Sequence, residues 1–251
     1  GAVAFMQPSF AMYRIIARSQ GQDVLPLPLN HAFDIDFDGS LKLIMERRPN
    51  ILFIAYPNNP TGNLFTRDKV KRLIAGFAGI VVVDEAYHSF AGESFINELD
   101  ESPNLVVLRT LSKVGLAGLR VGVMVAGKDV VDAVNKVRLP YNVNALSQAA
   151  VVTVLRRREV IDEQVRMIVE ERERLSASLS AISGVTVFPS RTNFIMFKLR
   201  GASEVFGLLK DDGILIKDLD SPGPLKDCLR VTVGTPEENG EFLKKFKELV
   251  S

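Results

Sequence analysis

Hydrophobic residues in the first half of the chain fall into short continuous runs separated by polar segments. Four such runs occupy residues 51–55, 80–83, 105–108 and 121–125. Short apolar runs rich in β-branched residues are typical of strands buried on both faces, as in a parallel sheet. Between the first two runs, residues 66–74 have a helical pattern with Thr66 as the candidate N-cap. The pattern therefore predicts an α/β fold with a mostly parallel sheet.

The pattern changes from about Asn142 onward. Residues 158–182 place one apolar stripe on an otherwise charged surface, which is typical of a long amphipathic helix. Beyond it, strands are expected at 185–188, 193–199, 214–217 and 228–233, with helices near 203–210 and from Pro236 onward. We therefore expect a large domain at residues 1–152 and a smaller C-terminal α+β domain at residues 153–251.

Composition narrows the classes of partner. The 251 residues are 47% hydrophobic and 24% charged, with a net charge of +1. This balance argues against nucleic acid or an anionic membrane as the main partner, because both select basic surfaces. One cysteine, Cys228, and two histidines leave little material for a disulfide or a metal site, so no metal is expected. No signal peptide and no membrane-spanning run of about 18 apolar residues is evident, which favours a cytoplasmic location.

Polar side chains gather where three of the predicted strands end. Residues 56–62 supply asparagines and a turn, residues 84–87 an aspartate and a tyrosine, and residues 109–113 hydroxyls and a lysine. Each segment alone fits an ordinary turn or helix cap. In open α/β sheets, however, ligands bind at the carboxyl ends of the strands. Together the three segments therefore predict a chemical site at one edge of the sheet.

These residues, in this order, resemble the pyridoxal-phosphate-dependent aminotransferases of the aspartate aminotransferase superfamily, and within it the histidinol-phosphate aminotransferase family. The similar motifs run along the whole chain, at residues 7–13, 58–62, 84–87, 109–113, 116–120, 138–144, 193–194 and 229–234. The resemblance implies a fold-type I transferase with a mostly parallel large domain and a smaller C-terminal α+β domain. It also implies a homodimer that transfers an amino group between glutamate and imidazole-acetol phosphate, a phosphorylated ketone, in histidine biosynthesis.

The resemblance gives roles to residues at the predicted edge. Lys113 would hold pyridoxal 5'-phosphate as a Schiff base and move a proton during the reaction, and Asp84 would pair with the ring nitrogen. Asn59 and Tyr87 would hydrogen-bond the phenolic oxygen of the cofactor. Phe10 would stack on its ring. The catalytic set implied is Lys113, Asp84 and Tyr87.

Further residues are implied to bind the anionic groups of cofactor and substrate. The cofactor phosphate would contact Thr110, Ser112 and Arg120, whose hydroxyls and guanidinium suit a dianion. Arg230 would bind the anionic group of the substrate, the carboxylate of glutamate or the phosphate of the ketone. Asn193 and Lys217 are the other candidates for substrate binding.

The sequence departs from the family pattern at several points. Phe10 stands where a tyrosine is usual, and Lys217 stands where an arginine is frequent, so the charge is kept but the bidentate fork is lost. Lys113 and Arg120 are seven residues apart, one fewer than the commonest spacing. Family members also carry a segment before the point that matches Gly1, including a helix start that binds the cofactor phosphate. We therefore expect the chain to be part of a longer protein.

Other functions remain open from the sequence alone. The same fold and lysine would serve an aromatic amino acid aminotransferase or a threonine-phosphate decarboxylase. A catalytically incompetent fragment with a structural or partner-binding role is a second alternative. A nucleotide-binding α/β protein is disfavoured, because no glycine-rich phosphate-binding sequence of the usual types follows a predicted strand.

Overall fold

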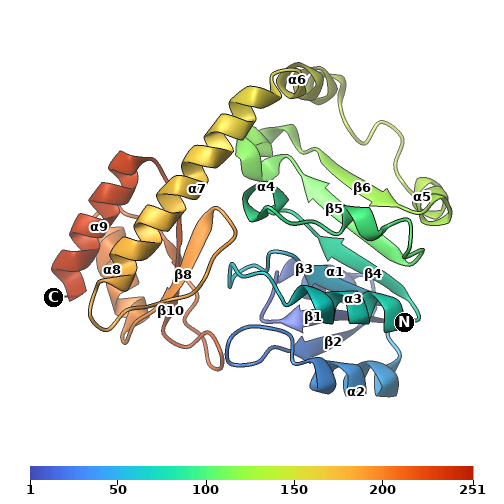
Figure 1. Cartoon of the computed structure of the whole chain (residues 1–251), viewed down its shortest axis with the longest axis horizontal. Coiled ribbons are helices and arrows are strands. Elements are labelled where there is room, and N and C mark those ends of the chain that lie inside the picture. Colours follow the sequence, from blue (N-terminus) through green and yellow to red (C-terminus); the bar gives the residue numbers. More distant parts are fainter. Residues whose placement is uncertain (251) are drawn as a thin grey trace.

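The computed structural model describes residues 1–250 and contains a six-stranded sheet in its first half. Its strands are β1 (Ala2–Gln7), β2 (Asp23–Pro28), β3 (Ile51–Ala55), β4 (Ile80–Asp84), β5 (Leu105–Thr110) and β6 (Gly122–Ala126). The order is β2-β1-β3-β4-β5-β6, and all neighbours are parallel except β5 and β6 (Figure 1). The predicted mostly parallel α/β sheet is confirmed. The edge strand β2 was not predicted, because its two prolines interrupt the apolar pattern and are tolerated only at an edge.

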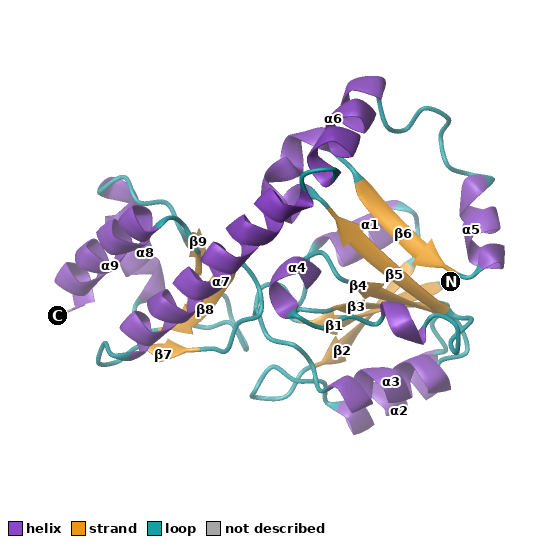
Figure 2. Ribbon diagram, turned by 45° about the horizontal axis from the view of Figure 1, so that its top comes forward, coloured by secondary structure: helices purple, strands orange, loops and turns teal. Residues whose placement is uncertain are grey.

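Helices cover both faces of this sheet (Figure 2). On one face α2 (Phe37–Arg47) and α3 (Arg67–Gly76) pack against residues that include Met6 of β1, while on the other face α1 (Met12–Ser19) packs against residues that include Phe5. Neighbouring residues of a strand point to opposite faces, so consecutive apolar residues fill both layers. This explains why the strands read as continuous apolar runs.

Helix α3 begins where the sequence predicts, but its N-terminus is held differently from the expected cap. Thr66 occupies the N-cap position, yet its side chain makes no capping hydrogen bond. Its Oγ1 donates instead to Oδ2 of Asp34 (2.8 Å), which also accepts a hydrogen bond from Nζ of Lys69 (2.7 Å). The predicted N-cap position of Thr66 is therefore confirmed, although its hydroxyl is bonded to a carboxylate from a distant loop and not to the helix backbone.

Three helices follow β6 along the sequence and precede the second sheet. These are α5 (Lys128–Asn135), α6 (Ala145–Leu155) and α7 (Arg158–Ser180). A four-stranded antiparallel sheet comes next, with β7 (Thr186–Val187), β8 (Phe194–Lys198), β9 (Lys217–Asp218) and β10 (Cys228–Thr232) in the order β7-β8-β10-β9. Two further helices are α8 (Ala202–Asp211) and α9 (Pro236–Val250). The predicted division at 152/153 falls within α6 and stays a prediction.

Most of the expected elements of this half are present, with one error of position. Instead of the strand expected at 214–217, only β9, Lys217–Asp218, pairs with β10. Ile214 and Ile216 pack against the apolar core of the second half instead. Among the helices of residues 1–250, none is long and apolar enough to cross a membrane. Cys228 is fully buried, and burial raises the pKa of its thiol to about 11, as expected of a structural thiol.

Alternation along the small sheet decides which side chains face the large sheet. Leu229 and Val231 of β10 point toward α7, α8 and α9 and join their apolar core. Cys228 lies on the opposite face and packs in a cluster with Phe33, which belongs to the first half of the chain. Arg230 shares this second face, because side chains two residues apart on a strand point the same way. The fold thus turns Arg230 toward the large sheet.

Candidate active site

The carboxyl ends of β3, β4 and β5 surround a cavity that brings together most of the predicted catalytic residues. It is lined by Phe10, Tyr13, Ala55, Pro57, Asn59, Asp84, Ala86, Tyr87 and Lys113. Its volume is about 50 Å³, and Phe10, which is 41% exposed, forms part of its wall. The three predicted catalytic residues and the predicted cofactor contacts Phe10 and Asn59 therefore lie at one place.

Asp84, the last residue of β4, is the most constrained ionisable group in this cavity. Its Oδ2 accepts a hydrogen bond from the Tyr13 hydroxyl (2.6 Å), and its Oδ1 accepts one from the Ala86 backbone N–H (3.1 Å). Burial raises the pKa of Asp84 above its ordinary value, although these hydrogen bonds and the charge of Lys113 act in the opposite direction. An ionised Asp84 is therefore incompletely compensated and suits a cationic partner.

Lys113 lies across the cavity in a short π-helical turn, Ser112–Leu116, that follows β5. Its Nζ is 5.1 Å from the centre of the Tyr87 ring, and Tyr87 in turn contacts the edge of Phe194 with ring centres 5.3 Å apart. The backbone leaves the helical conformation immediately after Lys113, and Gly115 has φ +85°. Glycine suits this position because a left-handed backbone is strained for residues with a Cβ atom.

Asn58 holds the two loops that carry Phe10 and Asn59. It is completely buried, and its Nδ2 donates to the backbone oxygen of Pro8 (3.0 Å) and to Oγ1 of Thr61 (2.8 Å). Its Oδ1 accepts a hydrogen bond from the Ser9 hydroxyl (2.8 Å). Sequence reasoning gave Asn58 no role of its own. The signal was the polar residue between a buried strand and a turn, where an amide can satisfy several backbone groups at once.

Fully buried Glu85 and partly exposed Arg109 form an ion pair beside the cavity, which sequence reasoning also missed. Glu85 is fully buried, and its carboxylate lies 3.0 Å from the Arg109 guanidinium. It also accepts hydrogen bonds from the Ser94 hydroxyl (2.9 Å) and the Phe95 backbone N–H (2.6 Å). Because Glu85 directly follows Asp84, this network fixes the end of β4 on the side away from the cavity. The two adjacent acidic residues were the only sequence signal.

Arg230 reaches the same site from the small sheet. Its Nη1 donates to Oδ1 of Asn59 (2.5 Å), and its guanidinium lies 4.6 Å from the centre of the Phe194 ring. Its Nε is buried without a hydrogen-bond partner among the described residues, and burial lowers the pKa of Arg230. Lys217 faces Arg230 directly across the β9–β10 pair. The Arg230 guanidinium therefore has a free N–H that could donate a hydrogen bond to an anion.

The residues predicted to bind the cofactor phosphate are not all brought together, in contrast to the residues that line the cavity. Thr110 donates to Oγ of Ser112 (2.9 Å), so these two hydroxyls lie together. Arg120 is exposed, and its backbone is in the left-handed conformation. Its guanidinium donates to the backbone oxygen of Ala117 (3.3 Å) and not to the hydroxyls of Thr110 and Ser112. Asn193 contributes its backbone oxygen to Val233 (2.9 Å) and does not line the cavity. Phosphate binding by Arg120 and substrate binding by Asn193 stay predictions.

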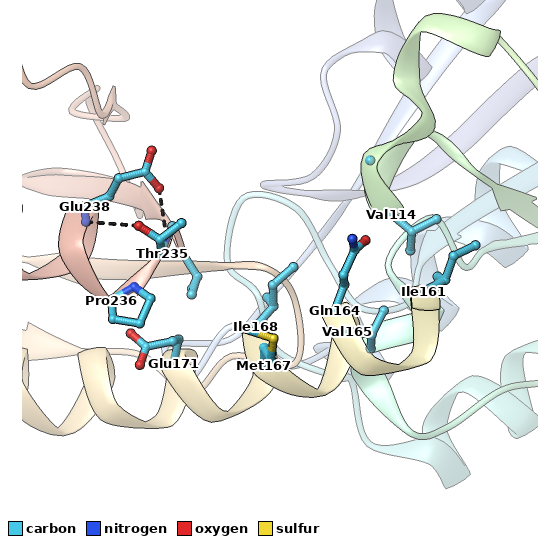
Figure 3. A pocket seen from close by; sticks show the side chains of 13 residues that line it. Val114, Ile161, Gln164, Val165, Met167, Ile168, Glu171, Thr235, Pro236 and Glu238 are labelled. Carbon is cyan, nitrogen blue, oxygen red and sulfur yellow. Dashed lines mark hydrogen bonds between the residues drawn. The ribbon is translucent and has the colours of Figure 1, made fainter. Parts of the chain in front are cut away.

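A second cavity of about 350 Å³ lies beside the site, between α7, the turn after Lys113 and the start of α9. Figure 3 shows Gln164 and Ile168 rising from α7 between Val114 and Thr235. Thr235 and Glu238 form reciprocal hydrogen bonds, a capping box that begins α9. None of the predicted site residues lines this larger space. The predicted catalytic residues thus line the smaller of the two cavities.

In the described part of the chain, no three histidine, cysteine, aspartate or glutamate side chains cluster in a way that could hold a metal ion. The donor set of the cavity is instead one carboxylate, one amine, one amide and two phenols. Such a set suits an organic cofactor with a cationic ring nitrogen and hydrogen-bonding oxygens.

Comparison with known proteins agrees with this chemistry. The family model described as "Aminotransferase class I and II" matches residues 1–246, so the chain belongs to this family. Enzymes of the family are pyridoxal-phosphate-dependent aminotransferases, and the predicted family and fold are confirmed. Histidinol-phosphate aminotransferase 2 of Nitrosococcus oceani is 44% identical over 249 residues, which cover 98% of this chain and 69% of the relative.

Two solved structures illustrate the fold and the range of chemistry it supports. Histidinol-phosphate aminotransferase of Sinorhizobium meliloti, solved with pyridoxal 5'-phosphate, has a TM-score of 0.89 at 23% identity and covers 100% of this chain and 70% of that one. L-threonine-O-3-phosphate decarboxylase of Porphyromonas gingivalis has a TM-score of 0.83 at 28% identity, with 99% and 76% covered. The first likeness shows the fold alone.

Proposed function

We propose that this chain transfers an amino group between glutamate and imidazole-acetol phosphate, giving 2-oxoglutarate and histidinol phosphate. The observation that carries the proposal is the convergence of Asp84, Lys113 and Arg230 from two separate sheets onto one site. The 44% identity to a relative named histidinol-phosphate aminotransferase supports this choice of substrate.

The residues present fit pyridoxal 5'-phosphate. Asp84 is a buried carboxylate whose raised pKa reflects an incompletely compensated charge, which a protonated ring nitrogen would relieve. Asn59 and Tyr87 offer hydrogen bonds beside it, and Phe10 offers an aromatic face. Because the cavity is small, we expect the half-exposed Phe10 side chain to move aside when the ring enters.

The chain's own residues then divide the work between binding and proton transfer. When bound, the cofactor supplies an electron-withdrawing ring next to the substrate α-carbon. Lys113, whose amine is freed when the substrate amine replaces it on the cofactor, would take the proton from the substrate α-carbon and deliver it to the cofactor, and Asp84 would keep the ring nitrogen protonated. Arg230 binds the anionic group of the substrate through its unpaired Nε and one terminal nitrogen. Asn59, already bonded to Arg230, links the substrate-binding residue to the cofactor-binding loop.

Replacing Arg230 with glutamine is expected to raise KM for glutamate about 10- to 100-fold, because a charge-assisted hydrogen-bonded pair is lost. Steady-state kinetics with varied glutamate would measure this change. Arg200→Gln, which removes an exposed arginine outside the site, is the matched control and should leave KM unchanged. An unchanged KM in the Arg230 variant would remove this residue from the substrate site.

The substrate assignment is tested by offering the purified chain, loaded with pyridoxal 5'-phosphate, a panel of amino donors with 2-oxoglutarate. Glutamate should form most rapidly from histidinol phosphate, more slowly from phenylalanine or tyrosine. The second candidate, favoured by the 28% identity to a threonine-phosphate decarboxylase, predicts release of carbon dioxide from O-phospho-L-threonine instead. Carbon dioxide release without glutamate formation would replace the proposed activity with the decarboxylase.

We further propose that the active form is a homodimer, as the resemblance implies, with α6 and the loop before it at the interface. Helix α6 is mostly apolar, yet Leu146 is 84% exposed and Tyr141, just before the helix, is 95% exposed. Figures 1 and 2 both show this region at the periphery of the chain. Exposed apolar surface concentrated in one region is typical of an interface between subunits.

Leu146→Asp is expected to shift the protein from dimer to monomer, because a charge buried in an apolar interface is costly. Analytical ultracentrifugation would report the mass of each species. The matched control is Met45→Asp, which changes another exposed apolar side chain, on α2 far from this face. A wild-type monomer, or a dimer that survives the Leu146 change, would contradict the proposed interface. A cytoplasmic location stays a prediction.

A further inference from the structure

We infer that Tyr13 is a positioning residue for Asp84: its hydroxyl fixes the direction of this carboxylate and favours its ionised form, so that Asp84 presents a negative charge to the cofactor ring. The inference rests on the proposed function, in which Asp84 pairs with the ring nitrogen. It adds a residue to which the sequence motifs gave no role. The observation behind it is the 2.6 Å hydrogen bond from the Tyr13 hydroxyl to Oδ2 of Asp84.

The Tyr13 ring is held firmly enough to direct its hydroxyl. It is 8% exposed and stacks on Phe53 of β3, with ring centres 4.8 Å apart and planes inclined by 18°. The edge of the neighbouring Phe10 ring contacts it at 5.5 Å, and its backbone N–H donates to the Phe10 oxygen (3.2 Å). The aromatic ring is thus fixed by packing that does not involve the hydroxyl.

The hydroxyl has a defined electrostatic effect on Asp84. A hydrogen bond donated to a carboxylate stabilises the charged form and lowers its proton affinity. The other ionisable groups that face Asp84 are Lys113 after β5, whose charge also favours ionisation, and its neighbours Glu85 and Tyr87. Burial is the largest influence and raises the pKa of Asp84, so Tyr13 is one of few groups that offset it.

The two oxygens of Asp84 also depend on different elements for their orientation. Oδ1 is held by the Ala86 N–H of its own loop, whereas Oδ2 is held by Tyr13 of α1. Without the hydroxyl, the carboxylate would keep one fixed donor and could rotate about the Cβ–Cγ bond. Loss of the Tyr13 hydroxyl should therefore reduce turnover without altering substrate binding by Arg230, which contacts neither group in this structure.

The test is Tyr13→Phe, which keeps the packed ring and removes only the hydroxyl. In the 251-residue chain without cofactor, infrared titration of the Asp84 carboxyl, assigned by difference against Asp84→Asn, should show protonation at higher pH than in the wild type. The matched control is Tyr56→Phe, since Tyr56 is also buried and donates to Glu93 (2.9 Å) outside the cavity. This control should leave the titration of Asp84 unchanged.

In the cofactor-loaded enzyme, Tyr13→Phe should lower kcat about tenfold, the loss expected for one hydrogen bond to a charged group, with KM for glutamate unchanged. An Asp84 titration identical to the wild type would overturn the inference, as would an equal loss of kcat in Tyr56→Phe. The titration needs no substrate, so it decides the role of Tyr13 separately. Failure of the wild-type enzyme to form glutamate would instead contradict the proposed function.

Discussion

Replacement of Lys113 with alanine is expected to lower kcat for transamination at least about 10⁴-fold, because one side chain both holds the cofactor and moves the substrate proton. No other lysine lines the cavity, so no neighbour can take over these roles. Glutamate formation from histidinol phosphate and 2-oxoglutarate measures the loss. Borohydride reduction with pyridoxal 5'-phosphate, followed by peptide mapping, should attach the cofactor to residue 113 in the wild type.

The matched control for this change is Lys128→Ala, which removes an exposed lysine on α5. It should retain wild-type turnover and cofactor labelling. Labelling at another lysine in the wild type, or full turnover in the Lys113 variant, would overturn the assignment of this residue.

The largest effect on stability is expected for Glu85→Ala. This change removes the partner of the Arg109 guanidinium, leaves a space where the buried carboxylate was, and deprives the Ser94 hydroxyl and Phe95 N–H of their acceptor. Removing one partner of a buried ion pair typically costs about 3–5 kcal/mol, so the free energy of unfolding should fall by that amount. Urea denaturation followed by circular dichroism would measure it.

An exposed ion pair provides the comparison. Asp132→Ala removes the partner of Lys128 at the surface of α5, and such pairs contribute only about 0–1 kcal/mol. If Glu85→Ala cost no more than this control, the buried pair would not anchor the end of β4 as described. Asp84 depends on that anchor, because it is the last residue of β4 and directly precedes Glu85.

The large-domain part of the site could be predicted because it is built from consecutive strands. Parallel strands place their carboxyl ends at one edge, so Asn59, Asp84 and Lys113 were expected together from their order alone. The hydrogen bond between Arg230 and Asn59 joins residues 171 positions apart and depends on how the two sheets pack. Sequence pattern places each of the two residues but not their contact.

Other features escaped prediction for local physical reasons. Tyr13 resembles any aromatic residue that anchors an amphipathic helix, and only the fold brings its hydroxyl to Asp84. Arg120 was expected beside Thr110 and Ser112, but its backbone is in the left-handed conformation and its exposed guanidinium donates to the Ala117 backbone oxygen.

The most direct test of the proposed function is glutamate production by the purified chain from histidinol phosphate and 2-oxoglutarate in the presence of pyridoxal 5'-phosphate. We expect steady glutamate formation by the wild type and none above background by the Lys113→Ala variant. Equal rates in the two proteins, or no glutamate from a wild-type protein that has bound the cofactor, would contradict the proposed aminotransferase activity.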